Sequence, residues 1–233
     1  MTLGCAAASA HAEDWLHFEG SLGATDYVAG GNGLYYQEGL EHHLDLRVPA
    51  GRIGVDADVI EPHGYVPGLS VNLSYMYFGQ ASIGGDAAPD PSGQFSQAGG
   101  YNTTTNTCNG PCGPIRNFAT GGSLQALALT LEPYWTAGSW RFGIEGGAAL
   151  FRGTWTAKMT VVSPSSPWGP EGTVQSLSHD PKPQLTWVAG ASVAYKRVTL
   201  RYTYISTPSR NVSDSNIPLG FKSANMLTLG YRF

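Results

Sequence analysis

Charge is scarce in this chain of 233 residues, of which only 13% are Asp, Glu, Lys or Arg. The aromatic content of 11% and the low charge do not fit a disordered protein. The 31 glycines and the many Tyr and Trp residues also argue against a helical enzyme. A net charge of −4 without a Lys/Arg cluster gives no indication of nucleic-acid binding.

Long hydrophobic runs are lacking too. A transmembrane helix needs about 18 or more consecutive apolar residues, and no stretch of the sequence approaches this length. The mean hydropathy of −0.15 is compatible with a β-barrel that has one polar face. A membrane location would therefore depend on β-strands.

The N-terminal residues resemble the end of a signal peptide. Ala10-His11-Ala12 is a small-x-small cleavage site, and we expect residues 1–12 to be a residual signal peptide without its charged region and most of its apolar region. A lipoprotein signal at Leu3-Gly4-Cys5 is the alternative, although Thr2 stands where Leu is preferred. Export would place Cys108 and Cys112 in an oxidising compartment, where they can form a disulfide.

Alternation of apolar and polar residues with a period of two is the main signal that the chain does carry. It predicts strands at 15–24, 40–60, 69–79, 127–135, 140–150, 185–195, 198–207 and 223–233. Residues 40–60 are counted as one strand, bulged or broken at Pro49 to Gly51, because single-chain bacterial barrels have even strand numbers. Residues 13–233 are expected to form one domain with extracellular loops at about 25–50, 80–122, 156–184 and 208–222.

The last predicted strand is the most informative segment. Leu227, Leu229, Tyr231 and Phe233 share one face, and the other face carries small or polar residues together with Met226. This strand resembles the terminal strand of bacterial outer-membrane β-barrels, which the barrel-assembly machinery recognises in that family. The resemblance implies an all-β, eight-stranded antiparallel transmembrane barrel of the OmpA/OmpX or phage-encoded surface type, monomeric and located in the bacterial outer membrane.

Charged residues fall on the faces predicted to point into this barrel. An Arg facing lipid would cost about 2–4 kcal/mol at the bilayer midplane, so an inward position is favoured. The sequence therefore predicts a salt-bridge network that plugs the lumen and argues against an apolar lumen; a gated proton or ion path is the alternative. The predicted network consists of Glu19, Arg52, Asp56, Asp58, Glu132, Arg141, Glu145, Arg201 and Arg232.

No catalytic, metal or cofactor site is predicted. Ser178-His179-Asp180 are consecutive and cannot form the hydrogen-bonded chain of a catalytic triad. His42 and His43 point to opposite faces of a strand. The His-x-Ser pattern of lipid A deacylases fails after His17, His43 and His179, where Glu19, Asp45 and Pro181 replace the Ser.

The sequence thus favours a non-enzymatic barrel that acts in surface interaction, adhesion or envelope integrity, including as an accessory subunit of a surface assembly. The expected partners are outer-membrane lipid including lipopolysaccharide, the assembly machinery, and a protein bound through the extracellular loops. A lipid A-modifying enzyme and a narrow channel are the alternatives.

Overall fold

The computed structural model describes residues 15–29, 42–87, 101–102, 107–108, 116–161, 170–179, 182–207 and 221–233. This part of the chain contains no helix that is long and apolar enough to span a membrane. Its strands are β1 (Leu16–Ala29), β2 (His42–Asp45), β3 (Arg47–Ile60), β4 (Gly68–Ala87), β5 (Tyr101–Asn102), β6 (Thr107–Cys108), β7 (Arg116–Ala137), β8 (Trp140–Val161), β9 (Val174–His179), β10 (Gln184–Tyr195), β11 (Val198–Ser206) and β12 (Phe221–Arg232).

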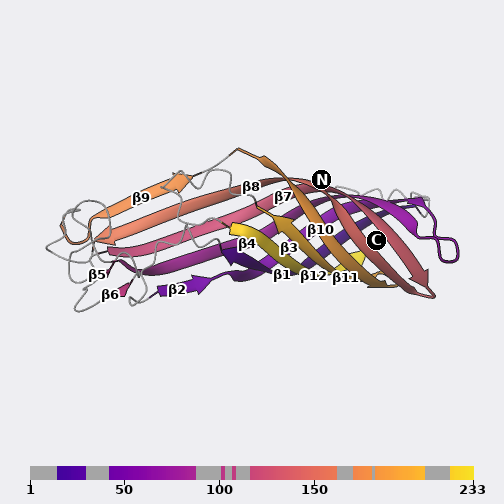
Figure 1. Ribbon diagram of the computed structural model, residues 1–233, viewed down its shortest axis with the longest axis horizontal. Coiled ribbons are helices and arrows are strands. Elements are labelled where there is room, and N and C mark those ends of the chain that lie inside the picture. The colour runs from indigo at the N-terminus through magenta and orange to yellow at the C-terminus, as the bar shows by residue number, and fades with distance from the viewer. Residues whose placement is uncertain are drawn as a thin grey trace, which may run out of the picture.

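Eight of these strands close into a barrel (Figure 1). The pairing order is β10, β11, β12, β1, β3, β4, β7 and β8, and β8 pairs with β10 to complete the ring. Every neighbouring pair in the ring is antiparallel. The ring therefore has no open edge, as a strand structure within lipid requires. The prediction of an all-β, eight-stranded antiparallel barrel is confirmed.

The last strand closes the barrel onto the first. β12 lies between β11 and β1, and the backbone N–H of Phe233 donates to the carbonyl of Phe18 at 2.8 Å. The first barrel strand therefore begins, and the last barrel strand finishes, on the side of the barrel that carries the short β3–β4, β7–β8 and β10–β11 connections (Figure 1). In outer-membrane barrels the short turns face the periplasm, so we call this the periplasmic end.

The second predicted strand is regular through Pro49. β3 pairs with β1 without a register shift, so the prediction of a bulge or break at Pro49 to Gly51 is wrong. The irregularity lies in β4, whose register against β7 shifts between Tyr77 and Gln80 and whose Gly79 has a φ of +81°. Pro49 has no N–H, so it cannot donate a backbone hydrogen bond to a neighbouring strand. The bulge in β4 lies beside this position. The strand is interrupted instead at Leu46, between β2 and β3.

Three barrel strands continue far beyond the others. β4 has 20 residues and β7 and β8 have 22 each, whereas β10, β11 and β12 have 12, 9 and 12. About 9–11 residues suffice to cross the hydrocarbon region. Beyond the barrel, β2 pairs with β4 and β9 pairs with β8. We call the extension in the order β2-β4-β7-β8-β9 the raised sheet; it comprises β2, β9, and residues 80–87, 116–124 and 152–161 (Figure 1).

The raised sheet occupies much of the predicted loops. Strands cover residues 80–87 and 116–122 of the loop expected at 80–122, and residues 156–161 and 174–179 of the loop expected at 156–184. β1 also extends to Ala29 and β12 begins at Phe221, inside the expected loops 25–50 and 208–222. These segments are rich in Gly, Ser and Thr. Above a bilayer neither face of a strand must be apolar, so the alternation that identifies membrane strands is absent there.

Two sequence-based expectations concern residues outside the described part of the chain. The residual signal peptide at 1–12 lies there, and so does Cys112, whereas Cys108 belongs to β6. The signal peptide and the disulfide therefore stay predictions.

Candidate functional site

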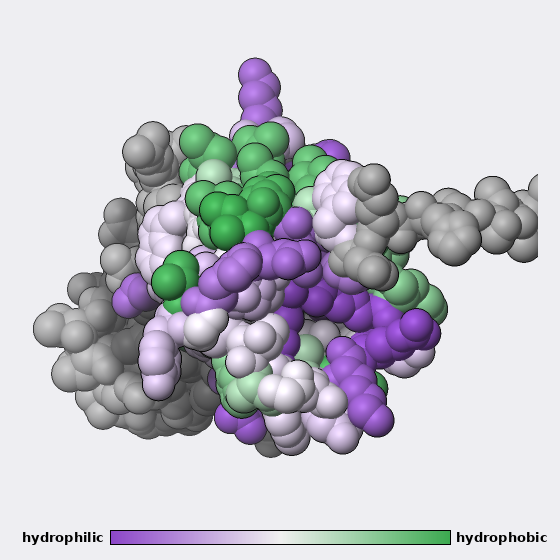
Figure 2. Space-filling view, turned by 90° about the vertical axis from the view of Figure 1, so that its right-hand side faces the viewer, coloured by the Kyte–Doolittle hydropathy of each residue, from purple (hydrophilic) through white to green (hydrophobic). Residues whose placement is uncertain are grey.

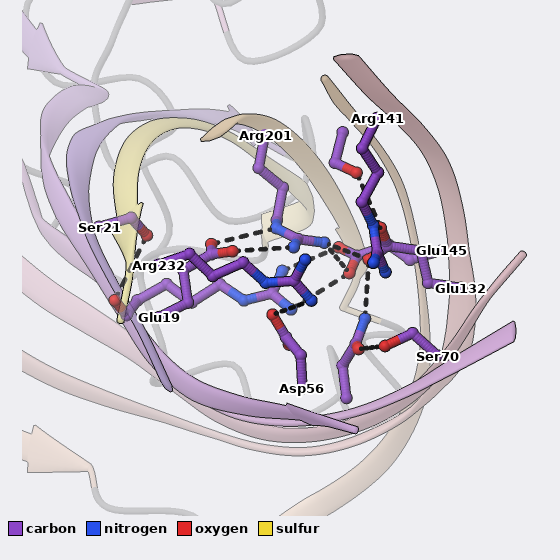
Figure 3. Close-up of polar contacts among 12 residues, drawn as sticks. Glu19, Ser21, Asp56, Ser70, Glu132, Arg141, Glu145, Arg201 and Arg232 are labelled. Atoms are coloured by element: carbon purple, nitrogen blue, oxygen red, sulfur yellow. Dashed lines mark hydrogen bonds and ion pairs between the residues drawn. The ribbon is translucent and has the colours of Figure 1, made fainter. Parts of the chain in front are cut away.

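Arg201 is the centre of a buried charge cluster inside the barrel. From β11, its Nη1 donates to Glu132 Oε2 and to Glu145 Oε2, both at 2.8 Å, and its Nη2 donates to Glu19 Oε2 at 3.1 Å (Figure 3). These carboxylates come from β7, β8 and β1. All four side chains are buried. One guanidinium thus joins β11 to β1, β7 and β8.

Arg52 on β3 completes the buried part of the cluster. Its Nη1 and Nη2 donate to Glu145 Oε1 and Oε2 at 2.9 and 3.1 Å, a two-pronged geometry that fits a guanidinium to a carboxylate. Thr203 Oγ1 donates to Glu145 Oε1 at 3.2 Å. The side chains of Arg52 and Glu145 are 2% and 0% exposed, so this pair is shielded from solvent.

Toward the periplasmic end the cluster reaches water. Arg141 donates to both carboxylate oxygens of Asp58 at 2.9 and 3.0 Å, and His17 Nε2 lies 3.4 Å from Asp58 Oδ2. Arg232 Nη2 lies 3.6 Å from Asp56 Oδ2 and 3.8 Å from Asp58 Oδ1. The side chains of Arg141, Arg232 and His17 are 13, 14 and 25% exposed. Figure 2 looks onto this end, where hydrophilic residues cross the middle of the face.

The structure brings all nine predicted network residues together on the inner face. The buried and wetter parts are joined by Arg141, whose Nε lies 3.8 Å from Glu132 Oε1. Asn72 and Ser192 also contact the network, since they donate to Glu132 Oε2 at 2.8 Å and to Glu132 Oε1 at 2.9 Å. For both residues, the sequence feature that could have predicted this contact is a short polar side chain at an inward position.

Two inward glycines make room for the carboxylates. A Cβ on Gly143 would collide with Glu132 Oε1 and lie 2.7 Å from Ser192 Oγ. A Cβ on Gly190 would lie 2.7 Å from Glu145 Oε1. A glycine inside a strand often marks such a close approach, so the sequence carried a signal for these positions as well.

The extracellular half of the lumen is packed mainly with apolar side chains, and the buried Thr25, Thr207 and Ser223 lie among them. Tyr27 stacks on Phe221 with ring centroids 4.2 Å apart, and the Tyr27 hydroxyl donates to the carbonyl of Gly79 at 2.9 Å. We call the buried residues around this pair the apolar layer; it contains Tyr27, Val48, Met76, Phe78, Leu124, Val188, Ile205, Phe221 and Met226. The argument against an apolar lumen therefore applies only to the periplasmic half.

The residues before Pro49 contained the signal for this layer. Leu46 and Val48 have the opposite parity to the outward residues Ile53 and Val55. Because β3 is regular through Pro49, the opposite parity means that Leu46 and Val48 point inward, where they contact the apolar layer. A bulge at Pro49 would have turned Leu46 and Val48 outward. Because the sequence analysis assumed this bulge, it did not predict the apolar layer.

The outer surface of the barrel is an apolar belt that ends at polar side chains. Above the belt, Arg47 Nε lies 3.4 Å from Asp26 Oδ1, and the Tyr75 hydroxyl donates to Gln125 Oε1 at 2.9 Å. Charged groups facing hydrocarbon are costly, so the belt ends below these residues. Exposed belt residues include Phe18, Leu22, Ile53, Leu73, Leu127, Leu129, Leu131, Phe142, Ile144, Leu150, Leu200, Leu227 and Leu229.

The chain is a small outer-membrane β-barrel. A closed antiparallel ring, an apolar belt outside and charges inside together define this architecture. The predicted location in the bacterial outer membrane and the resemblance to small eight-stranded barrels of the OmpA/OmpX type are confirmed.

Comparison with known proteins gives structural likenesses only. No protein-family model and no curated protein sequence matches this barrel. Among solved structures it is similar to Ail, the attachment invasion locus protein of Yersinia pestis, in complex with the heparin analogue sucrose octasulfate, with 15% identity, a TM-score of 0.41, and coverage of 94% of this chain and 99% of Ail.

Two further solved structures are similar. Neisserial surface protein A has 12% identity, a TM-score of 0.37 and coverage of 94% of this barrel and 95% of that chain. The outer membrane enzyme PagL has 11% identity, a TM-score of 0.31 and coverage of 93% and 98%. Because these TM-scores are low, the architecture of this barrel rests on its own strand pairing.

The residues considered as catalytic candidates lie in different parts of the barrel. His17 lies at the periplasmic mouth beside Asp58, whereas Ser178 and His179 lie in β9 on the raised sheet and Asp180 lies outside the described residues. Within the described ranges, no group of three or more His, Cys, Asp or Glu residues is arranged to hold a metal ion.

The outward face of β12 carries the residues predicted to be read during assembly. Leu227, Leu229, Tyr231 and Phe233 are all exposed on the barrel surface. Tyr231 and Phe233 contact each other with ring centroids 5.0 Å apart at the periplasmic end. Their recognition by the assembly machinery stays a prediction.

Proposed function

We propose that this protein is a non-enzymatic surface-interaction protein in which the barrel is a rigid scaffold and the raised sheet is the binding surface. The observation that carries the proposal is the length of β4, β7 and β8, which at 20, 22 and 22 residues is about twice what a bilayer needs. About ten extra residues at 3.3 Å each lengthen these strands by roughly 30 Å beyond the bilayer.

The outward face of the raised sheet is suited to water and to polar ligands. It carries Ser123, Thr154, Thr156 and Lys158, and Ser123 Oγ lies 2.9 Å from Thr154 Oγ1. Barrel strands below hold this sheet in place, because β4, β7 and β8 are continuous from the belt into it. Binding surfaces are commonly carried in this way by a rigid scaffold.

The filled lumen supports this proposal over a channel. Ion pairs occupy its periplasmic half and the apolar layer occupies its extracellular half. Support over a lipid A-modifying enzyme comes from His17, which pairs with Asp58 at the periplasmic end and not at the outer leaflet where lipid A lies.

The test is attachment of bacteria that display the full chain, compared with a variant that has a shortened sheet. Ser82 and Gly121 are paired across β4 and β7, so residues 83–120 can be replaced by a two-residue Asn-Gly turn. We expect retention on immobilised serum and extracellular-matrix proteins to fall to the level of non-expressing cells. Heat-dependent gel mobility checks that the shortened barrel still folds.

Two measurements decide against the alternatives. Mass spectrometry of lipid A from expressing cells should show no change, and a new acyl pattern would establish the enzyme instead. Equal attachment of the wild type and a folded shortened variant would contradict the role of the raised sheet.

A further inference from the structure

The β10–β11 turn carries two adjacent cations at the periplasmic end of the barrel. It consists of Lys196 and Arg197, whose side chains are both exposed. The other two connections at this end, 61–67 between β3 and β4 and 138–139 between β7 and β8, contain no Lys or Arg. Among the three connections at this end, positive charge is therefore confined to one.

The backbone of the turn is held on both sides. The N–H of Lys196 donates to the carbonyl of Ser139 in the β7–β8 turn at 3.0 Å, and the N–H of Arg232 donates to the carbonyl of Arg197 at 2.8 Å. Lys196 has a φ of +54°, a conformation that Gly normally supplies at the first position of a two-residue hairpin turn. Lysine in this conformation is strained, and retained strain of this kind points to a use for the side chain.

Among the described residues, no carboxylate forms an ion pair with either cation, because the ion pairs at this end lie inside the mouth of the lumen. Lys196 Nζ lies 5.5 Å from the centre of the Tyr195 ring, and Arg197 Nη1 donates to the Tyr231 hydroxyl at 3.5 Å. Both cations can therefore bind an external anion.

On the bilayer side of the turn, four outward side chains form a row across four strands. The strand registers place Trp140 opposite Tyr195, Tyr195 opposite Val198, and Val198 opposite Tyr231. These four side chains are 47, 45, 45 and 41% exposed. Tyr and Trp favour the headgroup region of a bilayer, so the row marks the depth at which lipid headgroups lie.

The row is continuous with the apolar belt. Two residues further along each strand, the same registers pair four exposed apolar side chains, which are Phe142, Val193, Leu200 and Leu229. Within the row, Val198 is smaller than Tyr195 and Tyr231, and the strands that carry these two rings lie about 10 Å apart. An acyl chain can therefore lie over Val198 between the rings while its headgroup reaches the turn.

We propose that the β10–β11 turn binds the phosphate of an anionic glycerophospholipid in the periplasmic leaflet of the outer membrane. A guanidinium and an ammonium both bind phosphate, and the Tyr231 hydroxyl, which accepts from Arg197, keeps its O–H for a further hydrogen bond. The ammonium of a zwitterionic headgroup is repelled by the two cations, so the turn selects anionic lipid. This site lies at the opposite end of the barrel from the raised sheet and does not depend on the proposed function.

Native mass spectrometry of the full chain tests the site. The protein is released from nanodiscs that contain equal amounts of phosphatidylglycerol and phosphatidylcholine with identical acyl chains, and the lipids that stay bound are counted. We expect the wild type to retain several-fold more phosphatidylglycerol than phosphatidylcholine.

Two variants that each lose two positive charges locate the site. Lys196→Gly with Arg197→Asn removes the cations and supplies residues that two-residue turns normally carry, so this turn variant should fold as well as the wild type. Lys182→Gln with Lys222→Gln removes two exposed lysines beside the extracellular ends of β10 and β12. The enrichment of phosphatidylglycerol should disappear in the turn variant only.

Three results would overturn the proposal. Equal retention of the two lipids by the wild type would show that the turn selects no headgroup. Loss of the enrichment in the variant without the two lysines would show that the charge at the periplasmic turn is not what selects the lipid. Enrichment that persists in the turn variant would also reject the site, and a lower amount of this variant folded in the outer membrane would then make the assembly machinery the occupant.

Discussion

A single guanidinium is shared by three carboxylates at the centre of the lumen. Arg201 contacts Glu19, Glu132 and Glu145, and Glu145 is shared in turn with Arg52. Burial makes each of these charges costly when it is alone, and the mutual hydrogen bonds offset that cost. The cluster therefore depends on every member being present.

Replacing Arg201 should destabilise the barrel strongly. Arg201→Met leaves three buried carboxylates without their common partner, and loss of one member of a buried pair typically costs about 3–5 kcal/mol. Urea unfolding in lipid vesicles measures the difference. Arg197→Met is the control, because Arg197 is exposed on the β10–β11 turn and its side chain donates to the Tyr231 hydroxyl at 3.5 Å. Equal unfolding midpoints for the two variants would contradict the prediction.

Two glycines of β8 should respond differently to the same substitution. Gly143→Ala places a methyl group against Glu132 and Ser192, and such overpacking costs about 1–3 kcal/mol. Gly146→Ala, three residues further along, meets nothing within 4 Å and should leave stability nearly unchanged. The same unfolding assay compares them, and equal stability of the two variants would show that the space beside Glu132 is not needed.

Along a strand, the character of the outward face changes where the chain leaves the bilayer. On β8 the outward residues include Trp140, Phe142, Ile144 and Leu150 in the belt, followed by Arg152 and then by threonines in the raised sheet. The backbone ladder is the same on both sides of Arg152. Only the solvent differs, so the side chains and not the secondary structure mark the membrane boundary.

An outward charge should therefore be tolerated on one part of β8 and not on the other. Ile144→Arg places a guanidinium in the belt, where it costs up to about 2–4 kcal/mol. Thr156→Arg places the same group in water on the same face. Folding yield into vesicles and unfolding free energy should fall for the first variant only. A similar loss for both would mean that the raised sheet contacts lipid.

For the whole molecule, the lumen has two successive seals of different chemistry. Water reaches the mouth around Arg141, Arg232 and His17 and meets the buried ion pairs beyond it. The apolar layer around Tyr27 and Phe221 lies on the extracellular side. An ion crossing the barrel would have to break the buried ion pairs and then enter the apolar layer without its hydration shell.

The intact barrel should consequently conduct no steady ion current. Planar bilayers that contain the purified protein are expected to show only the baseline conductance, while an open porin measured in the same way provides the positive control. Reproducible single-channel steps from folded protein, identified by its heat-dependent gel mobility, would revive the narrow channel and reject the sealed lumen.

Sequence patterns were sufficient wherever one face of a strand meets lipid. Alternation located the eight membrane strands, since lipid requires apolar residues at every second position. The same constraint placed the charges of Glu19, Arg52 and Arg201 inside, because no other position was tolerable for them. The even strand count followed from the rule that single-chain bacterial barrels have even numbers of strands.

The pattern of apolar and charged residues was therefore enough to predict the barrel, its membrane location and the inward set of charges. Tertiary structure alone decided which charge meets which, because Arg201 and Glu19 are 182 positions apart and only closure of the ring brings them together. It also decided that the Gly, Ser and Thr segments form the raised sheet, since in water strand pairing depends on neighbouring strands and leaves no apolar alternation in the sequence.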